Sequence, residues 1–411
     1  MRRLLPCAAL FALAFALPAA DEWPAHRGPH GNGTSDAKAL PTEWNEKTNI
    51  KWKVPLPGKA WSSPVVWGHQ VWVTNATPDG KQLSAVCVDR DKGTIVYDTK
   101  VFQIEKPQFA HAFNSHASCT PAIEDGRVYV HFGSSGTACL DTKTGEKVWE
   151  QTDLKCDHWR GPGSSPIIYQ DKLILIFDGH DKRYVTALHK SNGKPAWTTS
   201  RDIRYTSDDG DIKKAYATPA VVEVAGKPQL VCPSAECRVA YNPDDGKELW
   251  RVTHGGMNVS SRPVFGHGLM YLTSGHNGKL LAVKQGVSGV VPKDAVQWQT
   301  NKAVPTRPSL LLLGDLIFMV DDKGIASCLD AKTGKVHWSE RLGGEYSASP
   351  VSGGGHVYFC DQLGKTTVVK AAKEFESVAE NKLDGGFMAS PAVAGENLFL
   401  RTKTHLYCVG K

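Results

Sequence analysis

The chain has 411 residues, a formal net charge of +6 and 41% hydrophobic residues. This charge is small for the length, and no basic tract of the kind that follows a nucleic-acid backbone is present. No apolar stretch is long enough to cross a bilayer, including the short one near the start. We therefore expect neither nucleic-acid binding nor a membrane span.

Residues 1–20 have the pattern of a secretory signal peptide. Arg2 and Arg3 supply a positive start, and Leu10–Leu17 form an apolar core too short to span a membrane. Small residues at Ala19 and Ala20 mark the cleavage region, although Pro18 is unfavourable there. We expect an exported protein, periplasmic or extracellular.

Residues 21–49 form a polar lead-in rich in proline and glycine, with the letters WPAHRGPHGNG from Trp23 to Gly33. His26 and His30 have a spacing that some metal sites use. No helix is predicted here to place them on one face, so we interpret the segment as a surface loop and predict no metal site.

The stretch 118–149 contains one complete repeat unit. Pro121 opens a first strand, where its missing N–H is harmless, and Asp125-Gly126 has the composition of a hairpin turn. Alternating apolar residues from Val128 predict a second strand, and two further turns lead to strands at 138–140 and 148–149. A four-stranded unit of this size buries too little by itself and must stack on copies.

Eight copies of this unit follow the chain at intervals of about 47 residues, a spacing in the range of propeller blades. Their opening prolines are Pro64, Pro121, Pro166, Pro219, Pro263, Pro308, Pro350 and Pro391. A Gly-x-x-x-Trp ending recurs at Trp149, Trp197, Trp250 and Trp338, with Tyr97 in the first copy and Trp298 after an insertion in the fifth. The seventh copy has no tryptophan.

The eighth copy ends before its fourth strand, and a spare strand at Ile50–Val54 precedes the first copy. If that strand completes the last unit, the ring closes and no sheet edge stays open. The sequence thus predicts an all-β, eight-bladed propeller of four-stranded antiparallel blades over residues 50–411, closed by an N-terminal strand.

The cysteines do not have the pattern of a disulfide framework, because nine remain after Cys7. Those on the third strands, Cys87, Cys139, Cys328 and Cys408, are expected to be small packed residues. Two pairings stay open, Cys232 with Cys237 and Cys119 with Cys156.

The loops that converge around the channel of such a ring are unusually polar here. We take as candidate ligand-binding residues His116, Asp157, His158, Arg160, Lys214, Tyr216, Asn258, Arg262 and Arg307. The alternative is that these loops are polar because water wets them.

Arg262 and Arg307 are singled out by their position before an opening proline. Six other blades have serine or threonine there: Ser63, Thr120, Ser165, Thr218, Ser349 and Ser390. Two guanidiniums at the channel mouth require a negative group between them. That group is either a bound anion, which arginine grips well, or a neighbouring carboxylate such as Asp322.

The SP…VYV…LD…TGxxxW repeats resemble the pyrroloquinoline quinone (PQQ) repeat of quinoprotein-like propellers. That superfamily includes PQQ-dependent alcohol dehydrogenases and an outer-membrane assembly lipoprotein. The lead-in WPxxRGPxGxG and the channel loops are similar to those of exported PQQ-binding-like propellers of planctomycete type. The resemblance covers the mature chain and implies the fold more strongly than an activity.

Two functions follow from the resemblance. Quinoprotein dehydrogenases carry a ring of two adjacent cysteines beside the quinone and a calcium ion, and this sequence has no adjacent cysteines. We therefore expect a non-catalytic, monomeric binding or scaffold module of the cell envelope, whose partner is an envelope protein or a small anionic ligand. The alternative is a PQQ-dependent dehydrogenase that oxidises alcohols or sugars.

Overall fold

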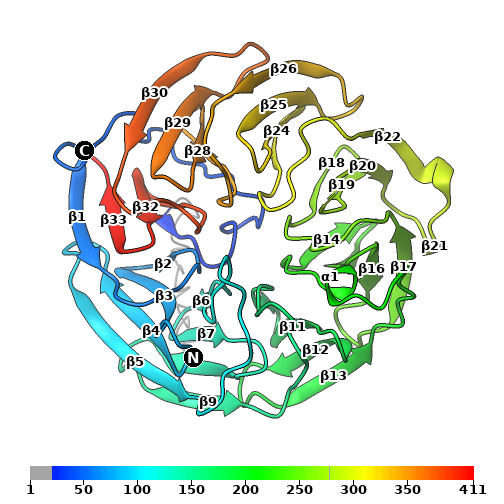
Figure 1. Ribbon diagram of the computed structural model, residues 1–411, viewed down its shortest axis with the longest axis horizontal. Coiled ribbons are helices and arrows are strands. Elements are labelled where there is room, and N and C mark those ends of the chain that lie inside the picture. The colour runs from blue at the N-terminus through cyan, green and yellow to red at the C-terminus, as the bar shows by residue number, and fades with distance from the viewer. Residues whose placement is uncertain (1–20, 277) are drawn as a thin grey trace, which may run out of the picture.

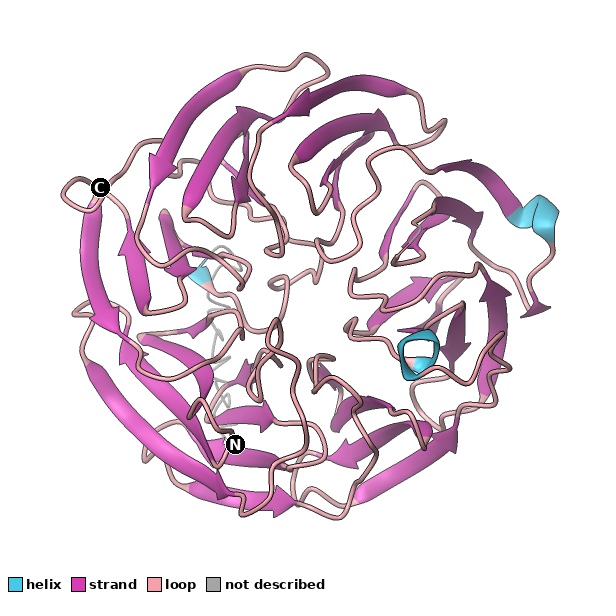
Figure 2. Ribbon diagram, in the orientation of Figure 1, coloured by secondary structure: helices cyan, strands magenta, loops and turns pink. Residues whose placement is uncertain are grey.

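The computed structural model describes residues 21–276 and 278–411, so the signal peptide predicted at 1–20 lies outside it. Eight antiparallel sheets stand as blades around a central axis (Figure 1), and nearly all regular structure is strand (Figure 2). Seven sheets have four strands, and the fourth blade gains a fifth, short one. The predicted all-β, eight-bladed propeller is confirmed.

Each blade runs from the axis outward through four strands. The innermost strands are β2 (Val65–Trp67), β6 (Ala122–Glu124), β10 (Ile167–Tyr169), β14 (Ala220–Val224), β18 (Val264–Gly266), β23 (Leu311–Leu313), β27 (Val351–Gly353) and β31 (Ala392–Ala394). The second strands are β3 (Gln70–Ala76), β7 (Arg127–His131), β11 (Lys172–Asp178), β15 (Lys227–Pro233), β19 (Leu269–Thr273), β24 (Leu316–Val320), β28 (His356–Cys360) and β32 (Asn397–Arg401).

The outer half of each blade is formed by its third and fourth strands. The third strands are β4 (Gln82–Asp89), β8 (Thr137–Asp141), β12 (Arg183–His189), β16 (Cys237–Tyr241), β20 (Leu280–Lys284), β25 (Ile325–Asp330), β29 (Lys365–Lys370) and β33 (His405–Val409). The fourth strands are β5 (Ile95–Gln103), β9 (Lys147–Gln151), β13 (Pro195–Ser200), β17 (Glu248–Thr253), β22 (Val296–Thr300), β26 (Val336–Arg341), β30 (Ser377–Lys382) and, in the last blade, β1 (Ile50–Pro55).

The last blade is completed by the strand from the other end of the described chain, as predicted. Strand β1 pairs antiparallel with β33, with Trp52 opposite Cys408 and Val54 opposite Leu406. Figure 1 shows the blue β1 beside the red β33 at the ring's edge. This pairing satisfies the outer edge of β33, so the eighth blade has the same four strands as the others.

The tryptophan of the Gly-x-x-x-Trp motif occupies the same register position in different blades. It lies on the fourth strand, opposite a small residue of the third strand: Trp149 is opposite Cys139, and Trp52 of β1 is opposite Cys408. The indole lies against the turn glycine of the next blade, where a methyl group on Gly193 would come within 2.5 Å of Trp149. Its Nε1 donates to the next blade's backbone, at 2.7 Å to the Lys190 carbonyl. The glycine of one blade thus receives the tryptophan of the blade before it.

Blades four, five and seven vary this contact. An insertion in blade five forms β21 (Gly289–Val290) and the short helix η2 (Lys293–Ala295), and β21 pairs in parallel with β17 of blade four. Trp250 is there 1% exposed, and its Nε1 donates to Gln229 of its own blade. The seventh blade has Ala379 at the tryptophan position. Trp149, Trp250 and Trp338 are buried as expected, whereas Trp197 is only half-buried.

The cysteines of the described chain are all buried and free. Cys87, Cys139, Cys328 and Cys408 lie at the equivalent third-strand position predicted for them. Neither open pairing, Cys232 with Cys237 or Cys119 with Cys156, is a disulfide. These thiols act as small packing groups.

The lead-in is not the surface loop that the sequence suggested. Trp23 and Arg27 are each 1% exposed, whereas His30 is exposed. The segment enters the ring (Figure 1) and bonds to free edges of inner strands: the N–H of Trp23 donates to Val66 of β2, and that of Ser352 in β27 donates to Gly33. These edges would otherwise leave unpaired backbone groups in the channel.

Arg27 anchors the lead-in on the propeller. Its Nη2 donates to the carbonyls of Asn32 and Leu310, each at 2.7 Å, and its Nη1 donates to Pro350. Gly33 packs on this guanidinium so closely that a methyl group would lie 2.4 Å from it. The glycines of the lead-in are therefore required by close packing around buried arginines.

The closing strand can be compared with an interior blade by truncating equivalent tryptophans. Trp52→Ala and Trp149→Ala should each lower the free energy of unfolding by about 3–5 kcal/mol, because both remove a large buried ring. Val96→Ala, at a site 44% exposed in β5, is the control and should change it by less than about 0.5 kcal/mol. Denaturant unfolding measures all three. A loss below about 1 kcal/mol for Trp52→Ala alone would contradict ring closure by β1.

Two glycines with similar backbone angles test the lead-in. Gly33 has φ +85° and touches Arg27, whereas Gly126 has φ +73° and nothing within 4 Å of an added methyl group. Gly126→Ala should cost about 1–2 kcal/mol for the left-handed backbone alone. Gly33→Ala should cost a further 1–3 kcal/mol, roughly, for overpacking. Equal losses in thermal or denaturant unfolding would show that the packing around Arg27 is loose.

Candidate functional site

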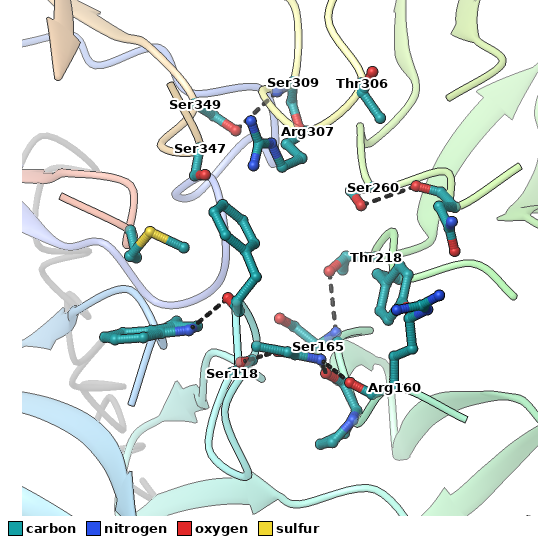
Figure 3. Close-up of a pocket in the computed structure, with 18 of the residues that line it drawn as sticks. Ser118, Arg160, Ser165, Thr218, Ser260, Thr306, Arg307, Ser309, Ser347 and Ser349 are labelled. Atoms are coloured by element: carbon teal, nitrogen blue, oxygen red, sulfur yellow. Dashed lines mark hydrogen bonds between the residues drawn. The ribbon is translucent and has the colours of Figure 1, made fainter. Parts of the chain in front are cut away.

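A cavity of about 550 Å³ opens on the channel face of the propeller (Figure 3). It is lined by residues that precede the innermost strands and by loops between second and third strands. Eleven lining residues are serines or threonines: Ser63, Ser118, Thr120, Ser165, Thr218, Ser260, Thr306, Ser309, Ser347, Ser349 and Ser390. Most belong to two tiers, each of which takes one residue from every blade.

The lower tier is the residue two before each innermost strand, and it links the blades by hydrogen bonds. In each bond a backbone N–H donates to the hydroxyl of the next blade. Distances are 2.9–3.1 Å for Ser63 to Thr120, Thr120 to Ser165, Ser165 to Thr218, Arg262 to Ser309, Ser309 to Ser349, Ser349 to Ser390 and Ser390 to Ser63. The last bond crosses the closure of the ring. We call this tier the hydroxyl ring.

The hydroxyl ring corrects the assumed equivalence of Arg262 and Arg307. Blade six contributes Ser309, so Arg307 lies two residues earlier and only Arg262 departs from the pattern. Pro308 resembles an opening proline in the sequence, but the equivalent position is Leu310, directly before β23. Because one residue separates Arg307 from Ser309 in an extended segment, both lie on the channel side.

The upper tier lies two residues before the hydroxyl ring and varies from blade to blade. Its members, in chain order, are Trp61, Ser118, Gly163, Tyr216, Ser260, Arg307, Ser347 and Met388, and all line the cavity. A uniform tier that joins the blades thus lies under a tier in which each blade presents different chemistry. The upper tier gives the cavity its individual character.

The lead-in lines the far end of the cavity. His26 is a lining residue, and its carbonyl accepts a hydrogen bond of 2.8 Å from Nη1 of Arg262. Arg262 also donates to the carbonyls of Gly31, at 2.9 Å, and Pro219, at 3.0 Å. Burial, with the charges of Arg262 and Arg27 next, lowers the pKa of His26 to about 3, so its ring is neutral near pH 7. Arg262 therefore holds the lead-in by backbone carbonyls.

The charged side chains of the cavity are paired with one another. Arg160 binds Asp211 through two hydrogen bonds, Nε to Oδ1 at 2.5 Å and Nη2 to Oδ2 at 2.6 Å. These bonds raise the pKa of Arg160 and lower that of Asp211. On another side of the cavity, Nε of Arg307 lies 3.2 Å from Oδ2 of Asp322. The carboxylate foreseen as a partner of Arg307 is therefore in contact with it.

Asp322 and Asp211 come from different parts of the fold. Asp322 follows β24, and its Oδ1 also accepts the backbone N–H groups of Thr306 and Arg307. Asp211 lies in the short helix α1 (Gly210–Lys213), where the side chain of Asp209 caps its N–H. Sequence reasoning named both arginines as candidates but missed Asp211 as a partner of Arg160, because 51 residues separate them.

The structure brings four of the nine candidate residues to the cavity: Arg160, Tyr216, Asn258 and Arg307. His116 packs against the turn at Gly80, and Asp157 is exposed in a loop where its Oδ1 accepts the N–H of Trp159. Arg262 holds the lead-in. The candidates do not form one cluster.

The remaining two candidates, His158 and Lys214, are buried together outside the cavity lining. Nε2 of His158 accepts the N–H of Ser134 at 2.9 Å, and Nζ of Lys214 lies 3.2 Å from Nδ1 of His158 and donates to the Asp178 carbonyl at 2.8 Å. Burial lowers the pKa values of both groups. They join the loops of blades two, three and four.

Comparison with known proteins places this architecture in a family. Residues 42–238 and 238–411 match a family model described as outer membrane protein assembly factor BamB. The chain belongs to this family of PQQ-repeat propellers. No helix among the described residues is long and apolar enough to cross a membrane.

Relatives of the chain fall into two kinds. Over 240 residues it is 22% identical to the outer membrane protein assembly factor BamB of Legionella pneumophila, covering 58% of this chain and 48% of that protein. Over 219 residues it is 28% identical to the quinoprotein alcohol dehydrogenase PedH of Pseudomonas putida, covering 49% of this chain and 32% of that one. These matches span about half and a third of the relatives' own length.

Solved structures of both kinds share the fold. BamB from Moraxella catarrhalis superposes with a TM-score of 0.61 at 12% identity, over 87% of this chain and 99% of that one. The quinohemoprotein alcohol dehydrogenase from Comamonas testosteroni gives 0.67 at 13% identity, over 95% and 81%. At such identities the likeness concerns the fold alone.

The cavity does not fit PQQ, which carries three carboxylates. Its two guanidiniums are already paired with Asp211 and Asp322, so no unpaired cation in the lining meets a carboxylate. Within residues 21–276 and 278–411, no group of three or more His, Cys, Asp or Glu side chains is placed to hold a metal ion. A tricarboxylate would enter a site with no net charge, where it gains little to replace its hydration.

The buried histidines predict a stability that falls in acid. Burial lowers the pKa of His131, which is 2% exposed, to about 3. Between pH 6.5 and 3 the unfolded chain binds a proton at this residue that the native state does not, so stability is complete above about pH 6.5 and falls as the pH decreases. His131→Gln should reduce the slope of unfolding free energy between pH 6 and 4.5 by about 1.4 kcal/mol per pH unit.

The exposed His30 provides the matched control. Denaturant unfolding at several pH values should give the parent slope for His30→Gln and a smaller slope for His131→Gln. The same slope in all three proteins would contradict a neutral, buried His131.

Proposed function

We propose that this chain is an exported, monomeric, non-catalytic propeller of the cell envelope that binds a small ligand or a partner's segment in its channel-face cavity. The observation that carries the proposal is the pairing of the cavity's charged groups. Asp211 and Asp322 are each held by an arginine, and Asp322 accepts two backbone N–H groups besides. The hydrogen bonds from Arg160 lower the pKa of Asp211, whereas a general base is most effective with a pKa near the working pH.

Membership of the BamB family supports this reading, because the family description names an assembly factor. The two-tier lining supports it as well. The hydroxyl ring joins the blades, so the upper-tier residues are not needed for that contact and can differ from blade to blade to suit a ligand. Small-molecule sites have volumes of about 300–1,000 Å³, a range that contains this cavity.

Binding in the cell envelope can be tested by replacing Ser347, in the upper tier, with a photo-crosslinking amino acid. Irradiation should then join the protein covalently to the molecule bound in the cavity. Val290, 77% exposed on β21 at the outer rim, is the control position and should give no such adduct. Equal adducts at both positions, or none at 347, would contradict binding in the cavity.

The second candidate function is a PQQ-dependent dehydrogenase, favoured by the 28% identity to the quinoprotein alcohol dehydrogenase PedH. Incubation with PQQ and Ca²⁺ followed by desalting separates the two functions. We expect no quinone absorbance on the protein and no dye-linked oxidation of alcohols or sugars. Saturable uptake with oxidation would favour the dehydrogenase.

A further inference from the structure

We propose that the cavity binds a neutral saccharide, an inference that rests on the proposed binding function and names its ligand class. Three properties of the cavity distinguish this class from ions and apolar molecules: the charge of its lining, its hydroxyl groups and its aromatic surface.

Charge disfavours an ionic ligand. The cavity lining holds two arginines and two aspartates, joined as Arg160–Asp211 and Arg307–Asp322. An anion would have to compete with a carboxylate already in place, and a cation with a guanidinium. A neutral ligand faces neither competition, because it leaves both ion pairs intact.

The pairs cancel charge without using all their hydrogen-bonding capacity. Arg160 contacts Asp211 through Nε and Nη2, and Arg307 contacts Asp322 through Nε. A guanidinium has five N–H donors, so donors outside these pairs remain on both side chains. Hydroxyl groups of the two tiers add sites that donate and accept. Each hydroxyl of a sugar also donates and accepts, which matches this mixture better than the acceptor-only oxygens of a carboxylate.

Apolar ligands are disfavoured by the same hydroxyl groups. Burying a serine or threonine hydroxyl against an apolar surface costs free energy unless it is bonded. Eleven of the lining residues have such a group. The seven in the hydroxyl ring already accept a backbone N–H, so for them the cost falls on the O–H donor. A ligand that carries its own hydroxyls can replace the water that they lose.

Aromatic side chains supply the apolar part of a sugar site. Phe113 lines the cavity and is 38% exposed, although large apolar side chains are usually covered. It is held in place, because the Arg307 guanidinium lies 4.4 Å from its ring centroid and its carbonyl accepts a bond of 3.1 Å from Trp61 Nε1. Trp61 and Tyr216 also line the cavity. Rigid aromatic surface suits the C–H faces of pyranose rings.

Binding of neutral trisaccharides tests the inference. Cellotriose, xylotriose, mannotriose and maltotriose are titrated into the protein by calorimetry, with citrate and trigalacturonate as anionic comparisons. We expect saturable binding of at least one neutral sugar, unchanged within twofold between 50 and 500 mM NaCl because no net charge is involved. Phe113→Ala should weaken it at least tenfold.

Phe109→Ala is the matched control, since Phe109 is 67% exposed in the same loop but does not line the cavity. It should bind the sugar as the parent does. Asp322→Asn supplies an independent readout: it leaves Arg307 without its carboxylate, so citrate binding should appear or strengthen at least fivefold and weaken with salt.

Citrate or trigalacturonate binding to the parent without any neutral sugar would overturn the saccharide class and leave cavity binding standing. Sugar binding equally lost in Phe109→Ala and Phe113→Ala would overturn the assigned site. No binding from either set would also overturn the inference, while the crosslink at position 347 decides the proposed function separately.

Discussion

The hydrogen bond from one blade's backbone N–H to the next blade's hydroxyl is the interaction on which the arrangement depends. A propeller blade contacts only its neighbours, so the ring is stabilised by the contacts that recur between adjacent blades. Here most junctions share two parts. Near the axis a hydroxyl accepts an N–H, as between Ser349 and Ser390, and at the rim a tryptophan lies on a glycine, as Trp149 does on Gly193.

The closing junction uses the same two parts although its partners lie at opposite ends of the described chain. Ser390 donates to Ser63, and Trp52 of β1 donates to the Arg90 carbonyl of blade one at 2.7 Å. The buried Arg401 adds bonds from blade eight to Ser62 and Thr74 of blade one. Closure is therefore built like an interior junction, since buried Arg201 and Arg238 also donate to the second strand of the next blade.

The single departure from the hydroxyl ring has a structural consequence. Arg262 cannot accept a hydrogen bond through its side chain, and it donates instead to carbonyls of the lead-in and of Pro219. Together with Arg27, it fixes the lead-in at the channel axis. Residues of the lead-in thus line one end of the channel, and the cavity opens at the other end.

Much of this was predictable because the repeats carry it locally. The period of the opening prolines and the turn glycines give the blades, and the third-strand cysteines give the packed position. The rest depends on contacts distant in the chain. Arg27 bonds to Pro350 and Leu310, and Arg160 pairs with Asp211; no repeat signals these partners. The prediction that Pro308 opens the sixth blade was wrong, because the position equivalent to the other opening prolines is Leu310, two residues later.

The most direct measurement for the closed ring is amide hydrogen exchange at two junctions. The N–H of Ser390 donates to Ser63 across the closure, and the N–H of Ser349 donates to Ser390 within the ring. If β1 completes the eighth blade, peptides that cover the two amides should exchange with similar protection, as should peptides from β1 and from interior fourth strands. Fast exchange at Ser390 and β1, with Ser349 still protected, would contradict a closed eight-bladed ring.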